Sequence, residues 1–296
     1  MFQGNIVALI TPMTEDGQLD LKRLPGLLDY LLAGGVHGIV AAGTTGEGAT
    51  LDEGEFEALV DAVVTHINGR IPVLAGTGMA GTAHTVARTR LVAQLGVDAA
   101  LVVTPYYNRP TQEGLAAHFT AVADEGAAPV VLYNVPTRTA SDLRPETVGQ
   151  LAAHPNIVAL KEAVPGADRI RALREATGDR LTLLSGDDDS CADAMGAGAN
   201  GVISVVANLA PAAWTALCAA SLAGDADKAR AILATLQPLL EQISVETNPI
   251  PVKWGAYELG LVGPGIRLPL VPLTQQHRPA LRASLERLGL MPGMEN

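Results

Sequence analysis

The sequence is poor in lysine and cysteine and has no long apolar run, and each of these scarcities excludes a class of protein. Only four of its 296 residues are lysine, and 31 acidic side chains outnumber 20 lysines and arginines, which gives a formal net charge of −11. Without a basic cluster to neutralise phosphates, neither a nucleic acid nor an anionic membrane is an expected partner. No apolar run approaches the length of a membrane span. The expected ligands are therefore small molecules.

The cysteines and histidines lack the spacing of a metal site. Cys191 and Cys218 fall in helical patterns, and we interpret both as reduced residues in or near the core of a cytoplasmic protein. The amino terminus has no basic leader, which favours the same compartment. The three carboxylates at 187–189 point in different directions, so we expect them to cap the following helix rather than bind a metal. Since 76–78 lacks the third glycine of a dinucleotide loop, no cofactor is expected.

Short β-rich runs alternate with longer amphipathic runs as far as about residue 224, which is the pattern of a parallel sheet with helical crossovers. The predicted strands cover 6–10, 38–42, 72–75, 99–103, 129–133, 157–161, 181–184 and 201–204. The predicted helices cover 21–33, 52–67, 82–95, 112–125, 145–153, 167–177, 190–196 and 211–222. This alternation predicts the α/β class and a (β/α)₈ TIM barrel.

Strand signals stop after residue 224, while the runs 227–241, 251–261 and 276–288 have helical periodicity. We therefore predict a catalytic barrel over 1–224 and a C-terminal helical domain over 225–296. No linker rich in serine or proline separates the two parts, so we expect the helices to pack directly on the barrel.

The active site of such a barrel lies at the carboxyl ends of the strands, so the segments that follow the strands are the place to look for chemistry. The run GTTGE at 43–47 could cradle an anion, because its glycines let backbone N–H groups converge and Thr44 and Thr45 add hydroxyl donors. It lacks the lysine of a P-loop, so a carboxylate is the expected ligand. A plain tight turn between strand and helix is the alternative.

Lys161 follows the apolar run at 157–160, which has the pattern of a strand buried on both faces. An amine at the end of such a strand is removed from water, which disfavours its charged form and makes it nucleophilic, as a Schiff-base lysine requires. Lys161 could instead emerge into solvent or pair with Glu162. The other lysines lie in segments with a helical pattern, from which an ammonium can reach water: Lys22, Lys228 and Lys253.

Tyr133 ends one predicted strand and Lys161 ends the next, so neighbouring strands place a phenol and an amine at the same depth. A phenol there can transfer protons while a carbinolamine forms and loses water, and Thr44 and Tyr107 are available as relay partners. Arg138 lies on the loop after Tyr133, where its planar guanidinium could bind a substrate carboxylate through two hydrogen bonds. A tyrosine on the barrel rim and an arginine on the surface are the alternatives.

These motifs resemble the dihydrodipicolinate synthase family of the pyruvate-dependent class I aldolase superfamily, which also holds N-acetylneuraminate lyase. The resemblance covers essentially the whole chain. The superfamily motifs imply the barrel and Schiff-base chemistry, and the narrower match depends mainly on Arg138 and Tyr107. The matching motifs lie at 11–12, 43–47, 104–108, 133–136, 161–162, 185–188 and 248–253.

The resemblance implies a role for each residue of the pyruvate site. Lys161 would form an imine with pyruvate. Thr44 and Thr45 would hold the pyruvate carboxylate, aided by the backbone at Gly186 and Ile203.

It also implies the proton relay, the second substrate and the assembly. Tyr133, Thr44 and Tyr107 would form the relay, and Tyr107 would reach into the active site of the adjacent subunit, within a homotetramer built from tight dimers. The enamine would attack the aldehyde of aspartate semialdehyde, whose carboxylate Arg138 would bind, in the diaminopimelate route to lysine.

Two alternatives remain at this point. A lyase that cleaves N-acetylneuraminate or a keto-deoxy-sugar acid would use the same Lys161 and Tyr133, but such enzymes generally lack the arginine found here at 138. A barrel that only binds a small acid would not need Lys161, Tyr133 and Thr44 together.

Feedback inhibition by lysine is expected to be weak or absent. The resemblance implies that regulated relatives bind lysine at the subunit interface, typically with an asparagine and a glutamate at the positions of Ala80 and His84. Without those groups an ammonium lacks acceptors. Glu53 is the available substitute carboxylate.

Overall fold

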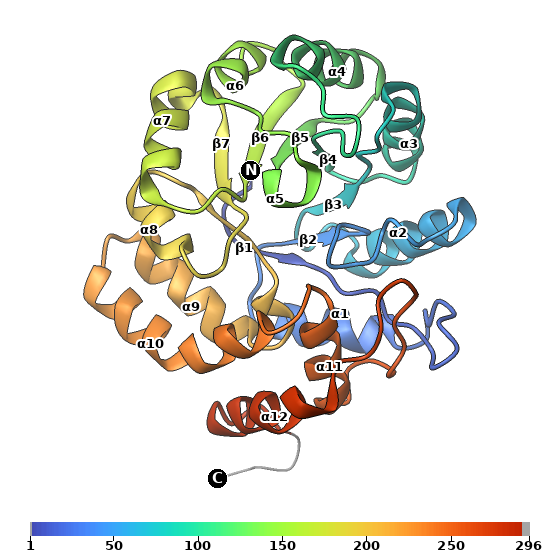
Figure 1. The fold of residues 1–296 in the computed structure, drawn as a ribbon, viewed down its shortest axis with the longest axis vertical. Helices are drawn as coiled ribbons and strands as arrows, with labels where there is room; N and C mark the ends of the chain where they lie inside the picture. The colour runs from blue at the N-terminus through green and yellow to red at the C-terminus, as the bar shows by residue number, and fades with distance from the viewer. Residues whose placement is uncertain (1, 292–296) are drawn as a thin grey trace.

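The computed structural model describes residues 2–291, and its centre is a closed barrel of parallel strands (Figure 1). Each strand pairs with its neighbour in the sequence, and β8 closes the ring on β1. The predicted α/β barrel is confirmed, and each predicted strand overlaps an observed one. The strands are β1 (Gly4–Ala8), β2 (Gly38–Ala41), β3 (Val73–Gly76), β4 (Ala99–Val103), β5 (Val130–Asn134), β6 (Ile157–Glu162), β7 (Thr182–Ser185) and β8 (Gly201–Ser204).

Helices join successive strands and form a layer around the barrel (Figure 1). Local sequence explains their ends, as α2 illustrates: Asp52 accepts from the backbone N–H of Glu55 at 2.8 Å, while the Glu55 carboxylate accepts from the N–H of Asp52 at 3.1 Å. This reciprocal capping box satisfies two N–H groups that the helix cannot pair internally. The helices are α1 (Leu24–Ala33), α2 (Glu53–Ile67), α3 (Thr82–Gln94), α4 (Gln112–Glu125), α5 (Pro136–Thr139), α6 (Pro145–Leu151), α7 (Ala167–Thr177), α8 (Cys191–Gly196) and α9 (Pro211–Leu222).

The helices differ from the prediction at two places that matter. Helix α1 begins at Leu24 instead of residue 21, with Pro25 in its first turn, where the missing N–H of proline costs nothing. The short helix α5 was not predicted, because one turn is too short to show a hydrophobic period. It carries Arg138, which the sequence placed on a loop.

Two apolar layers make up the core. One lies between the strands and the surrounding helices. The other fills the inside of the barrel, where Val40, Leu74, Val131, Leu184 and Ile203 are almost fully buried. Because side chains fill this interior, the barrel is not a pore, and a substrate can enter only at its rim.

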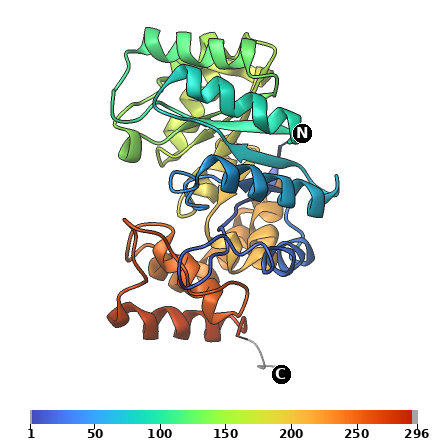
Figure 2. The same ribbon diagram turned by 90° about the vertical axis from the view of Figure 1, so that its right-hand side faces the viewer.

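Three helices follow the barrel: α10 (Ala226–Ile243), α11 (Ile250–Glu258) and α12 (Arg278–Arg287). Helix α10 packs on α9, and the last helices lie at the opposite end of the molecule from α3, α4 and α6 (Figure 2). The apolar layer outside the barrel continues into α10 through Leu236 and Leu239. The division after residue 224 stays a prediction, and residues 292–296 of the predicted helical domain lie outside the described residues.

Candidate active site

Lys161 and Tyr133 lie side by side where β5 and β6 end. The strand register pairs the two residues, and the ammonium nitrogen Nζ of Lys161 is 4.3 Å from the centroid of the Tyr133 ring. Both side chains are 6% exposed. Lys161 therefore neither emerges into solvent nor pairs with Glu162, whose carboxylate binds Arg169 instead. The phenol and the amine are at the same depth, as their positions at the strand ends predict.

A cavity of about 440 Å³ opens at this end of the barrel. Its volume suits a small molecule. Lys161 does not reach the wall of the cavity but lies over the Tyr133 ring, which does. The polar residues of the wall include Thr44, Glu47, Arg88, Tyr106, Tyr133, Arg138, Thr139, Thr247 and Asn248.

The loop 43–47 presents Thr44 to the cavity and keeps Thr45 buried. The hydroxyl oxygen of Thr45 accepts from the side-chain amide of Asn248 at 3.0 Å. Thr11 donates to the carbonyl of Gly46 at 2.6 Å, and a Cβ on Gly46 would lie 2.8 Å from the carbonyl oxygen of Leu9, so glycine is needed there. The loop is a tight turn whose two threonines face different partners.

Lys253 contradicts the prediction that it reaches water from a helix. It lies in α11, its side chain is 4% exposed, and Nζ pairs with the buried carboxylate of Glu47. The other carboxylate oxygen of Glu47 accepts from the backbone N–H of Arg267 at 3.0 Å. Burial lowers the pKa of Lys253, and the charge of Glu47 opposes that shift. The pair fastens the end of the 43–47 loop to the C-terminal helices.

Arg138 and Asn248 meet at the mouth of the cavity. Nη2 of Arg138 donates to the backbone carbonyl of Asn248 at 3.3 Å, and the side chain remains exposed. Asn248 thus contacts both Arg138 and Thr45. Sequence reasoning gave Asn248 no role, and the only signal was its place at the start of the motif that ends in Lys253.

Gly186 lies against the side chain of Lys161. A Cβ at Gly186 would lie 3.0 Å from Cε of Lys161, so a larger residue would press on the lysine side chain. Its N–H donates to the carbonyl of Glu162 at 2.6 Å. Ile203 lies on β8 with its side chain 1% exposed inside the barrel, and it does not line the cavity.

Tyr107 lies apart from the other candidate residues within the chain. Its side chain is 94% exposed, and it is absent from the cavity wall. Its backbone has φ of +74°, and the N–H of Asn108 donates to the carbonyl of Tyr106 at 2.9 Å, which makes Tyr107 the centre of a γ-turn. A tight turn of this kind projects the tyrosine outward from the chain.

The three aspartates at 187–189 do not act alike. Asp187 accepts from the N–H of Ser190 at 3.0 Å, at the start of α8, as a capping residue would. Asp188 does not cap α8: the residue is half-buried, its carboxylate accepts from the N–H groups of Val205 and Val206, each at 2.9 Å, and burial of this group raises its pKa to about 6. Within residues 2–291 no group of three or more His, Cys, Asp or Glu side chains is arranged to hold a metal ion.

Comparisons with known proteins agree with this geometry. The model of the dihydrodipicolinate synthetase family matches residues 1–288. A 4-hydroxy-tetrahydrodipicolinate synthase of Alcanivorax borkumensis is 50% identical over 98% of this chain and 99% of its own. That of Xanthomonas axonopodis pv. citri is 52% identical over 94% and 91%. The crystal structure of the chloride-inhibited dihydrodipicolinate synthase of Acinetobacter baumannii with pyruvate superposes with a TM-score of 0.96, at 44% identity over 98% of this chain and all of that one.

None of the helices described over residues 2–291 has the length and apolar character needed to cross a membrane. The match of the family model to nearly the whole chain, together with relatives about half identical to it over 91% and 99% of their lengths, shows that this chain belongs to the dihydrodipicolinate synthetase family.

Proposed function

We propose that the chain catalyses the condensation of pyruvate with L-aspartate 4-semialdehyde to 4-hydroxy-tetrahydrodipicolinate, in the diaminopimelate route to lysine. Its family membership and the names of its relatives support this activity. The structural observation that carries it is the buried amine of Lys161 over the ring of Tyr133, which lines the cavity. An amine held out of water in this way is suited to nucleophilic attack on a ketone.

The first half of the reaction makes a carbon nucleophile. The amine of Lys161 adds to the ketone carbon of pyruvate, and the carbinolamine loses water to give an imine. Tyr133 carries the protons of both steps, with Thr44 as its neighbour on the cavity wall. Thr44 and Thr45 bind the pyruvate carboxylate, with the backbone at Gly186 and Ile203. Loss of a methyl proton from the imine then gives the enamine.

The second half joins the two substrates. The enamine carbon forms a bond with the aldehyde carbon of the semialdehyde, whose carboxylate is bound by Arg138. The amino group of the semialdehyde then displaces Lys161 and closes the ring, which frees the enzyme. The position of Arg138 at the cavity mouth supports this role, because a second substrate must arrive after the imine has formed below it.

The working form is a cytoplasmic homotetramer built from tight dimers. Tyr107 supports an assembly of this kind, since it projects from a γ-turn with 94% of its side chain exposed and cannot serve the cavity of its own chain from there. In a dimer its hydroxyl completes the proton relay of the adjacent subunit. A relay completed across the interface makes the dimer the smallest active unit.

Cleavage of N-acetylneuraminate or of a keto-deoxy-sugar acid is not favoured. The relatives at 47–52% identity are named as synthases, and the arginine at 138 faces the cavity. A barrel that only binds a small acid would not need a buried amine beside a phenol.

Borohydride trapping tests the proposal. Incubation with pyruvate and borohydride reduces the imine to a stable amine, so the peptide that holds Lys161 should gain the mass of the reduced pyruvyl group. The buried Lys253 is the internal control, because its Nζ is paired with Glu47 and should remain unlabelled. Label on Lys253, or no label anywhere, would refute the Schiff-base mechanism.

A further inference from the structure

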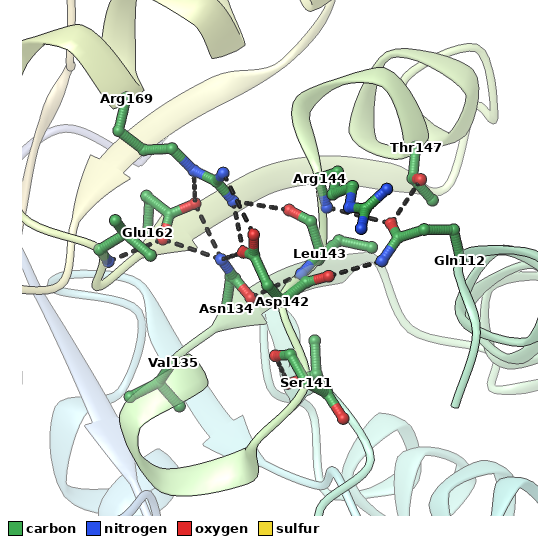
Figure 3. A network of polar contacts seen from close by, with 12 residues as sticks. Gln112, Asn134, Val135, Ser141, Asp142, Leu143, Arg144, Thr147, Glu162 and Arg169 are labelled. Atoms are coloured by element: carbon green, nitrogen blue, oxygen red, sulfur yellow. Dashed lines mark hydrogen bonds and ion pairs between the residues drawn. The ribbon is translucent and has the colours of Figure 1, made fainter. Parts of the chain in front are cut away.

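A network of polar side chains lies at the ends of β5 and β6, and it includes Asn134, Asp142, Glu162 and Arg169 (Figure 3). Side chains alternate between the two faces of a strand, so Asn134 and Glu162, which follow Tyr133 and Lys161, point outward toward the helices. The register pairs Asn134 with Glu162 just as it pairs Tyr133 with Lys161. We propose that Asn134, Glu162 and Arg169 are positioning residues that hold the amine and the phenol at their working separation. The inference rests on the function proposed above.

Hydrogen bonds join Asn134 and Glu162 directly. The side-chain amide of Asn134 donates to both carboxylate oxygens of Glu162, at 3.0 and 3.1 Å, and its oxygen accepts from the N–H of Leu143 at 2.9 Å. Glu162 also accepts from the N–H of Val164 at 2.8 Å. Both side chains are inaccessible to water. The bonds therefore extend the pairing of β5 and β6 past the last residues that face the cavity.

Arg169, in the first turn of α7, closes the network (Figure 3). Its Nε donates to Glu162 at 3.0 Å, and its Nη2 donates to Asp142 at 2.7 Å and to the carbonyl of Leu143 at 2.8 Å. Burial raises the pKa of Glu162, and the guanidinium opposes that shift. Removing the cation from a buried carboxylate strongly destabilises a protein. We therefore expect the loss of one member to disturb the positions of the others.

The network also contacts Gly186, on the other side of the Lys161 side chain. The backbone carbonyl of Glu162 accepts from the N–H of Gly186, which packs against the Lys161 side chain. A shift of Glu162 therefore moves both the backbone that carries Lys161 and the glycine that confines it. Misplacement of reacting groups by about 1 Å can cost on the order of 100-fold in rate.

Two arginines of α7 supply a matched comparison. Arg169 lies at the end of the helix near the cavity. Arg174 lies at the other end and also makes several hydrogen bonds, but to neutral partners: the carbonyls of Gly178 and Gly198 at 2.6 and 2.8 Å and the side chain of Asn200 at 3.2 Å. Arg169→Lys and Arg174→Lys each keep the charge and lose the planar fork. Thermal stability is measured for both variants so that a loss of folding is separated from a loss of catalysis.

The experiment measures kcat, KM for pyruvate, thermal stability and the rate of borohydride trapping for Arg169→Lys, Glu162→Gln, Arg174→Lys and the wild type. We expect Arg169→Lys and Glu162→Gln to lower kcat and the trapping rate about 10-fold or more, with a smaller change in KM. Arg174→Lys should keep the wild-type kcat. Because Arg169→Lys removes no charge, it keeps the test valid if Glu162→Gln fails to fold.

The outcomes separate the two proposals. Trapping and turnover at the wild-type rate in folded Arg169→Lys would refute the positioning role and leave the proposed function standing. Equal losses of kcat in Arg169→Lys and Arg174→Lys would also refute it, since a general loss of stability would then explain both. If the wild type itself traps no pyruvate, the proposed function falls, and this inference with it.

Discussion

Arg138 and Lys161 have opposite surroundings, the first exposed and the second buried. Its guanidinium is exposed at the cavity mouth and is held by one hydrogen bond to the carbonyl of Asn248. The remaining N–H groups are directed at no carboxylate of the described chain, so a substrate carboxylate can take them in a two-bond, charge-assisted contact. Lys161, by contrast, is buried beside the ring of Tyr133.

We predict that Arg138→Ala loses turnover far more than it loses imine formation. A lost contact between two charged groups is worth about 1.5–3 kcal/mol, which corresponds to at least ~10-fold in rate. Steady-state assays with aspartate semialdehyde measure the loss, and borohydride trapping with pyruvate alone measures imine formation. Arg138→Lys is the matched control, because it keeps the positive charge and loses the planar guanidinium. Full activity of Arg138→Ala would contradict the synthase assignment and favour a lyase.

At the scale of elements, the loop 43–47 and helix α11 behave as one unit. Glu47 reaches the buried Lys253, and Asn248, just before α11, reaches Thr45. Glu47 has a backbone φ of +53°, a strained conformation for a residue with a side chain, so these contacts hold the loop in a shape it would not adopt alone. Contacts from the C-terminal part of the chain therefore shape the loop 43–47.

Lys253→Met should destabilise the protein more than the double variant Glu47→Gln/Lys253→Met. The single change leaves a buried carboxylate without its cation, which costs about 3–5 kcal/mol, whereas the double change removes both charges. Thermal unfolding of the two variants measures the difference. Arg90→Met serves as the control, because it breaks an exposed pair with Glu125 that should contribute roughly 1 kcal/mol or less. A single variant no less stable than the double would show that Glu47 does not depend on Lys253.

At the scale of the whole molecule, the cavity extends from Tyr133 outward to Arg88 and Tyr106, near the exposed Tyr107. The guanidinium carbon of Arg88 lies 3.7 Å from the centroid of the Phe56 ring. Burial lowers the pKa of Arg88, and the nearby carboxylate of Glu53 opposes that shift. A cation in this part of the cavity would therefore meet the positive charge of Arg88. The carboxylate of Glu53 already interacts with that charge.

We predict that lysine inhibits the enzyme weakly or not at all. Ala80 and His84 cannot neutralise an ammonium group, and Arg88 repels one, so the dissociation constant of lysine should be higher by orders of magnitude than that of a site with a free carboxylate. The measurement is activity at saturating pyruvate in a lysine series that reaches the millimolar range near pH 8. Half-inhibition at submillimolar lysine would show that another group accepts the ammonium.

The strands, most helices and the place of Lys161 beside Tyr133 follow from the sequence alone. They depend on local periods, which are two residues in a strand and 3.6 in a helix, and on the rule that parallel strands end at one rim. The apolar run at 157–160 stops at Lys161, and this alone places the lysine near the end of a strand. The roles of Thr44, Thr45 and Arg138 needed family resemblance as well.

Tertiary structure alone decided which distant groups meet. Glu47 pairs with Lys253, which is 206 residues away, and Asn248 reaches Thr45 across 203 residues. Asp188 turned away from α8 to the backbone after β8, because a buried carboxylate takes the nearest unpaired N–H groups whichever element supplies them. No local period records how α11 docks on a loop, since that geometry depends on the packing of the whole chain. The burial of Lys253 could therefore be known only once the helices were in place.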